Sequence, residues 1–214
     1  MTYNVRQVSK WFIDFNSGAA SETLDGHLKL QKLLYYAQAM KLAVTGEKLF
    51  NDRIEAWANG PVVNNMFVEY RHNQFVPRSR AFDTPEFDEE TTKILEIVNS
   101  IYGSQSSDQL VNLTHSEKPW GELEAEAKNR LNPEIKVEKI REYYEPLADL
   151  YEVYKDYDFS VEKIEEINGN VFVYNKHETE LSEENYRDLW DFGDKVKNEK
   201  YFIYKDENGE LVMY

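Results

Sequence analysis

The chain of 214 residues contains no cysteine. Disulfide bonds, thiolate zinc sites and cysteine nucleophiles are therefore excluded, and nothing implies an oxidising compartment. The sequence also has no run of about 18 apolar residues that would cross a membrane, and Met1–Asp14 lacks the basic-then-apolar pattern of a leader segment. We expect a cytoplasmic protein that does not bind a membrane.

Motifs of the commonest enzyme classes are missing as well. The sequence has no P-loop, no dinucleotide-binding glycine fingerprint, no Gly-x-Ser-x-Gly elbow and no His-Glu-x-x-His pair. The four histidines lie far apart, and none has a second histidine at a helical ligand spacing: His27, His72, His115 and His177. We therefore expect a protein that is not an enzyme, with no metal site and no cofactor.

Positive charge is scarce. Lysine and arginine number 25 against 40 aspartates and glutamates, which gives a net charge of -15 and a pI near 4.8. Because contacts with phosphate supply most of the affinity for DNA or RNA, we expect no direct nucleic-acid binding. A basic protein partner fits better, and acidity for solubility alone is the alternative. The excess of acidic over basic residues is concentrated near the C-terminus, where residues 146–214 hold 18 acidic and 8 basic residues.

Apolar residues at spacings of three and four predict helices over the first 155 residues. These helices carry Val5–Phe15; Leu30–Val44, closed by Gly46; Val63–Tyr70, begun by Gly60-Pro61; Ile94–Ile101, begun by Asp88; Leu110–Leu113, begun by the capping pair Ser106 and Gln109; and Val137–Tyr154, broken at Pro146. Residues 73–85 are the best candidate for a linker.

The pattern changes after Asp158. Asn168-Gly169 and Asn208-Gly209 each stand between aromatic and β-branched runs, which predicts two hairpins. Between them, residues 181–197 have the spacing of a helix capped by Ser182. We therefore predict an α+β fold, with a mainly α-helical domain over residues 1–155 and an acidic ββαββ extension over residues 159–214.

Three segments are candidates for function, and each also has a structural interpretation. Tyr35-Tyr36 places one phenol sideways from the core, although such a stripe more often packs inside. The segment Trp57–Pro61 is a specified turn that either binds a ligand or fixes the fold. His115 precedes Glu117 and Trp120, which allows an imidazole beside a carboxylate, while a histidine bonded to backbone is the plainer interpretation.

Taken together, these segments resemble the Panacea domain, also called the SocA-like antitoxin domain. The resemblance covers about residues 5–145 and rests on Lys29-Leu30-Gln31-Lys32-Leu33-Leu34-Tyr35-Tyr36-Ala37-Gln38-Ala39, on Leu49-Phe50 with Ile54-Glu55-Ala56-Trp57-Ala58-Asn59-Gly60-Pro61-Val62-Val63, and on Leu113-Thr114-His115 with Pro119-Trp120. Asn59 stands where the family commonly has an aromatic residue.

The resemblance implies a mostly helical domain of bacterial toxin–antitoxin pairs and prophages that binds a toxin protein and neutralises it. It names no catalytic residue, and some relatives act instead as adaptors that deliver the toxin to a protease. Our hypothesis is that the domain docks a basic toxin, with exposed tyrosines and the Trp57 turn as anchors. The candidate partner-binding residues are Tyr35, Tyr36, Trp57, Asn59, Gly60, Pro61, His115 and Trp120. Both a monomer and a homo-oligomer are compatible with the sequence.

The acidic extension supports an alternative of another class. In that alternative, the chain is a prophage-borne inhibitor whose acidic face imitates nucleic acid and blocks a defence nuclease or another nucleic-acid-binding protein. The extension lies outside the region that resembles the Panacea domain, so this alternative rests only on the residues of the extension.

Overall fold

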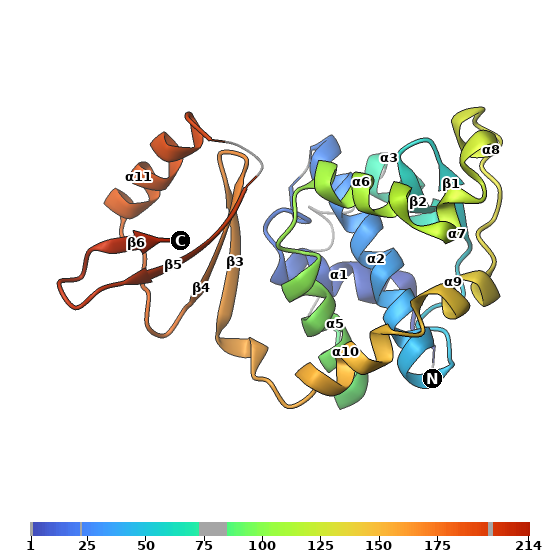
Figure 1. Ribbon diagram of the computed structural model, residues 1–214, viewed down its shortest axis with the longest axis horizontal. Coiled ribbons are helices and arrows are strands. Elements are labelled where there is room, and N and C mark those ends of the chain that lie inside the picture. Colours follow the sequence, from blue (N-terminus) through green and yellow to red (C-terminus); the bar gives the residue numbers. More distant parts are fainter. Residues whose placement is uncertain (1, 22, 73–84, 197–198) are drawn as a thin grey trace.

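The computed structural model describes residues 2–21, 23–72, 85–196 and 199–214. A bundle of helices forms one end of the molecule and a small α+β unit forms the other (Figure 1). The predicted α+β class is therefore confirmed. Most of the linker expected at residues 73–85 lies outside the described residues. No helix in the described ranges is long and apolar enough to cross a membrane.

Helix α2, Leu24–Thr45, is the centre of the bundle. Its first turn is capped by the Thr23 hydroxyl, which accepts from the Gly26 amide, and it ends at Gly46 in the left-handed conformation, as expected. The elements α1, α5, α6, α9, α10 and β2 all pack against it. Because α2 is surrounded, residues on nearly every side of it are buried.

The other helices begin and end largely where caps predict. They are α1 Val5–Phe15, α3 Asn64–His72, α5 Glu89–Ile101, α6 Ser107–Ser116, α7 Lys118–Gly121, α8 Glu124–Lys128, α9 Val137–Tyr144 and α10 Leu147–Tyr154. Asp88 caps α5, and Ser106 with Gln109 forms the expected capping box of α6. The break at Pro146 separates α9 from α10, also as expected. The sequence patterns did not indicate the short helix α8.

The prediction that Gly60-Pro61 begins a helix is wrong. Strand β1, Ile54–Trp57, pairs antiparallel with β2, Gly60–Val63, and α3 begins only at Asn64. Pro61 lies opposite Ala56, whose amide points away from β2 and donates to the Pro133 carbonyl. The amide that proline lacks is therefore not needed for this pairing, and the strand tolerates it.

The C-terminal extension, residues 159–214, has the predicted ββαββ order. A 3-10 turn, Phe159–Val161, leads into β3 Glu162–Ile167, β4 Asn170–Asn175, α11 Glu183–Gly193, β5 Lys200–Lys205 and β6 Leu211–Met213. The sheet order is β3-β4-β5-β6, and α11 is the crossover between the parallel strands β4 and β5. One sheet face and α11 enclose a core of Phe172, Tyr174, Leu189 and Ile203.

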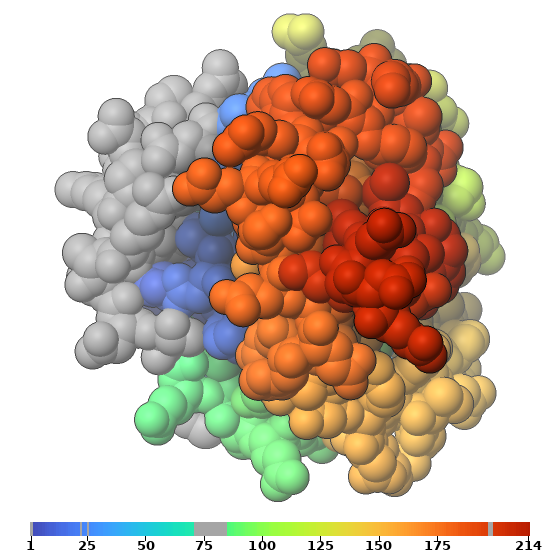
Figure 2. Space-filling model, turned by 90° about the vertical axis from the view of Figure 1, so that its left-hand side faces the viewer, coloured from blue at the N-terminus to red at the C-terminus, as the bar shows by residue number. Residues whose placement is uncertain are grey.

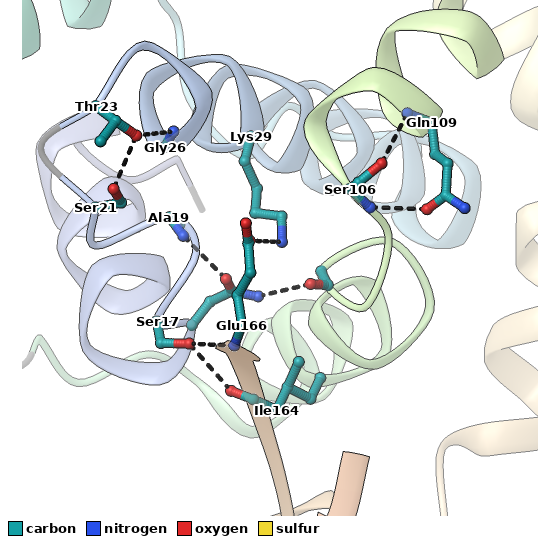
Figure 3. Close-up of polar contacts among 12 residues, drawn as sticks. Ser17, Ala19, Ser21, Thr23, Gly26, Lys29, Ser106, Gln109, Ile164 and Glu166 are labelled. Atoms are coloured by element: carbon teal, nitrogen blue, oxygen red, sulfur yellow. Dashed lines mark hydrogen bonds and ion pairs between the residues drawn. The ribbon is translucent and has the colours of Figure 1, made fainter. Parts of the chain in front are cut away.

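Strand β3 joins the extension to the helical part (Figure 3). The Glu166 amide donates to the Ser17 hydroxyl at 3.1 Å, and the Glu166 carboxylate accepts from the buried Lys29 ammonium at 3.0 Å. Gly18 leaves room for this ion pair, since a Cβ there would lie 2.5 Å from Glu166 Oε2. The division into domains at residues 155–159 stays a prediction.

Candidate functional site

The β1–β2 hairpin places a short turn at the surface of the helical part. Trp57 and Gly60 pair across the turn, and the two residues between them, Ala58 and Asn59, are exposed. Gly60 has a φ of 95°, a conformation that side chains rarely adopt. The turn is therefore specified by the Asn-Gly dipeptide, which favours tight hairpins.

A buried lysine donates hydrogen bonds to the backbone of this turn from the protein interior. Lys32 of α2 is fully buried, and its ammonium donates to the Asn59 carbonyl at 2.5 Å and to the Pro61 carbonyl at 3.1 Å. Burial lowers the pKa of Lys32 from 10.5 to about 7, because a charge away from water is unfavourable. A Cβ at Gly60 would lie 2.6 Å from Lys32 Nζ and 2.6 Å from Thr114 Oγ1, so the turn sits directly on these two groups.

Two rings from the region of α6 and α7 hold the turn from the side. The Trp120 indole is buried and donates to the Trp57 carbonyl at 2.9 Å. The His115 imidazole stacks on Trp120 with centroids 3.9 Å apart, and its Nε2 has no hydrogen-bond partner among the described residues. Burial, with a smaller contribution from the Lys32 charge, lowers the pKa of His115. His115 is therefore mainly neutral near pH 7 and contributes an apolar ring face.

The Trp57 side chain lies half-buried at the edge of the hairpin. Its indole nitrogen donates to Glu55 Oε2 at 2.9 Å, and its ring lies 4.6 Å from the ring of Phe67. These contacts fix the orientation of the indole while part of it stays open to solvent. A large aromatic ring that is already fixed loses little entropy on binding, which is a property of interface anchors.

The expectation of exposed tyrosines as anchors is wrong. Tyr35 and Tyr36 are 1% and 0% exposed, because α2 is surrounded and leaves no solvent-facing side for either ring. Of the eight residues proposed from the sequence, Gly60, Pro61 and Trp120 are also buried. The structure brings Trp57, Asn59 and His115 together at a surface, which we call the hairpin surface.

The two tyrosines belong instead to a buried polar cluster centred on Glu117. Tyr36 donates to Glu117 Oε2 at 3.0 Å, Tyr144 donates to the same oxygen, and the rings of Tyr36 and Tyr102 stack 3.8 Å apart. Burial raises the pKa of Glu117 to about 7, and the two hydroxyls oppose that rise. Between Glu117 and His115, no hydrogen bond is found in the described structure.

Lys32 and Tyr144 were not among the residues proposed from the sequence. Lys32 had no usable signal, because it follows Gln31 on a helix that also carries Lys29 and Lys41, and its partners lie elsewhere in the chain. Tyr144 had none, since it meets Glu117 only through tertiary packing. Over the described ranges, no group of three or more histidine, aspartate or glutamate side chains is arranged to hold a metal ion.

Residues 30–121 match the family model of the antitoxin SocA-like, Panacea domain. The matched range contains residues 30–45 of α2 and the whole β1–β2 hairpin, and it includes Lys32, His115 and Trp120. The residues that build the hairpin surface therefore all lie within the domain. This finding confirms the resemblance over residues 30–121, a narrower range than the residues 5–145 over which the resemblance was expected. The comparisons with curated proteins and with solved structures gave no match.

Proposed function

From the premise that this chain carries a SocA-like antitoxin domain, we propose that it neutralises a protein toxin by binding it directly through the hairpin surface. Inhibition is by occlusion, so it needs no catalytic residue. The main observation in favour of this surface is that Lys32 and Trp120 donate hydrogen bonds to the backbone of the turn. The tip is thereby presented in one conformation to a partner.

The support matters because a binding loop that is ordered beforehand loses less entropy when it docks. Three contacts from two separate elements hold a turn whose own residues, Ala58 and Asn59, make up its exposed tip. Trp57 contributes to the fold through Glu55 and Phe67, and the part of its ring that stays open to solvent beside the exposed tip is available to a partner. We therefore infer that contacts with Trp57 and its neighbours determine how long the toxin stays bound.

The net charge of -15 supports a basic toxin. Electrostatic attraction raises association rates by roughly 10- to 1000-fold at low salt and affects dissociation much less. Raising the salt concentration should therefore slow association far more than it speeds dissociation. Equal changes in both rates would show that charge does not steer the encounter.

The test is co-expression with the neighbouring reading frame, scored for rescue of growth, followed by affinity measurements on single variants. Asn59→Arg enlarges the exposed tip and should weaken binding by about tenfold or more without lowering the melting temperature. Val153→Arg is the matched control, because Val153 is 73% exposed on α10. An unchanged affinity for Asn59→Arg would refute docking at the hairpin surface.

The C-terminal extension favours a second candidate, in which the chain imitates nucleic acid and inhibits a nucleic-acid-binding protein. Residues 159–214 hold 14 acidic and 7 basic residues. Removing these residues should abolish such inhibition, whereas a toxin neutraliser that acts through the hairpin surface should keep its activity. A thermal melt of the shortened chain is the control that its helical part still folds.

A further inference from the structure

Helix α11 covers one face of the C-terminal sheet and turns its other side to solvent (Figures 1 and 2). Leu189 faces the core, whereas the Trp190 side chain is 56% exposed. Tyr186 stands one turn before Trp190, is 37% exposed, and has its hydroxyl fixed by Glu165 at 2.9 Å. An indole so exposed contributes little to folding, so its presence calls for another explanation.

The charges around Trp190 are also unfavourable for the helix itself. Asp191 lies in the last turn of α11 and Asp194 caps its end, although the carbonyl end of a helix favours positive charge. Asp194 has a structural role, because it accepts from the Asn168 side chain at 2.8 Å. Asp191 is exposed, and no described contact explains it. Acidity for solubility would explain Asp191, but it would not explain Trp190 beside it.

Helical spacing puts these groups on one face. Glu183, Tyr186, Trp190 and Asp194 are separated by three or four residues, and Asp191 borders them. We call these five residues the α11 face. Arg187 is the only basic residue between positions 183 and 194, and its pairing with Glu183 at 3.7 Å is open to solvent.

We propose that the α11 face docks an arginine-rich segment of a protein partner. An arginine guanidinium can stack on the Trp190 indole and pair with the adjacent carboxylates at the same time, and it is more weakly hydrated than a lysine ammonium. The same contacts would neutralise the carboxylates that oppose the dipole of α11. The aromatic and acidic features, each unfavourable alone, become favourable together in such a complex.

The α11 face lies at the opposite end of the molecule from the hairpin surface (Figure 1). It is therefore a second docking surface, and a partner bound to it leaves the hairpin surface free. The inference does not rest on toxin neutralisation. Failure of one proposal leaves the other standing, because the two are tested on different residues with different ligands.

The probe is a fluorescein-labelled, alanine-based helical peptide with arginines along one face, titrated into the full-length chain at low salt. Amide and indole NMR shifts should concentrate on α11 and on the Trp190 N–H. Trp190→Ala should weaken binding by about tenfold, as loss of an interface anchor does. Tyr204→Ala, which removes a 47% exposed ring from the sheet face opposite α11, should change it less than about twofold.

A pair of charge variants separates local recognition from general attraction. Glu183→Gln with Asp191→Asn removes two charges from the α11 face, and Glu138→Gln with Glu142→Gln removes two exposed charges from α9. Only the first pair should weaken binding by about tenfold, with melting temperatures measured for every variant. Equal losses from both pairs, shifts spread over the whole surface, or no binding at low salt would each overturn the proposal.

Discussion

Replacing Lys32 with methionine should change how the stability of the protein depends on pH. In the folded chain the pKa of Lys32 is lowered from 10.5 to about 7, whereas the unfolded chain keeps the ordinary value. Between these two values the unfolded state binds more protons, so the free energy of unfolding rises with pH. Below about pH 7 both states are protonated, and the folded state bears the full cost of a buried charge.

The size of the effect follows from the shift. From about pH 7 to about pH 9.5, one group with these two pKa values should raise the free energy of unfolding by about 3 kcal/mol. Methionine at position 32 cannot titrate. The free energy of unfolding of the wild type minus that of Lys32→Met should therefore increase by the same amount over this pH range. The variant also loses the hydrogen bonds to the Asn59 and Pro61 carbonyls, which shifts the difference by about 1–3 kcal/mol at every pH.

The assay is urea unfolding of both proteins over this pH range, with Lys48→Met as the control at an exposed lysine. Taking the difference removes the contributions of all other titrating groups. A difference between wild type and Lys32→Met that stays within about 0.5 kcal/mol from pH 7 to pH 9.5 would refute the lowered pKa. It would also remove the argument that a buried, desolvated amine supports the turn.

Three further predictions concern the packing around the candidate site and the extension. In the wild type, the free energy of unfolding should fall by about 2–3 kcal/mol between about pH 4.5 and pH 7, because the raised pKa of Glu117 makes the folded state bind more protons there. Glu117→Gln should remove this fall. The same dependence of the free energy of unfolding on pH in both proteins would contradict the prediction. Gly60→Ala should destabilise the protein by about 2–4 kcal/mol, because residue 60 has a positive φ and an added Cβ would lie too close to Lys32 and Thr114. Gly121→Ala is the control, since there is open space around Gly121, and it should change the stability by less than about 1 kcal/mol. Urea unfolding measures both. Gly18→Ala should displace the Glu166 carboxylate and speed hydrogen exchange in β3, and unchanged exchange there would show that the ion pair does not hold the extension.

Much of the fold could be predicted from local sequence signals. Capping residues such as Ser106 and Asp88 act within one turn of the helix they begin, so sequence alone reveals them. Asn168-Gly169 is likewise a local signal for a tight hairpin, although the Asn168 side chain also donates to the Trp190 carbonyl and to Asp194. The prediction at Gly60-Pro61 failed because proline suits the first turn of a helix as well as this strand, so the local pattern is compatible with both.

The candidate site was harder to predict, because burial depends on tertiary packing. Tyr35 and Tyr36 follow each other on a helix and would normally face different directions, but α2 is covered on nearly every side and both rings are inside. The support of Asn59 by Lys32 joins residues 27 positions apart and leaves no local trace. Sequence patterns therefore misjudged which residues of these segments reach the surface.

The most direct test of docking at the hairpin surface is a hydrogen-exchange footprint of the full-length chain, free and in complex with the toxin that it neutralises. We predict that the amides of Trp57, Ala58 and Asn59, with those around His115, become protected when the toxin is bound. A stable complex in which exchange at these amides is unchanged would contradict the account.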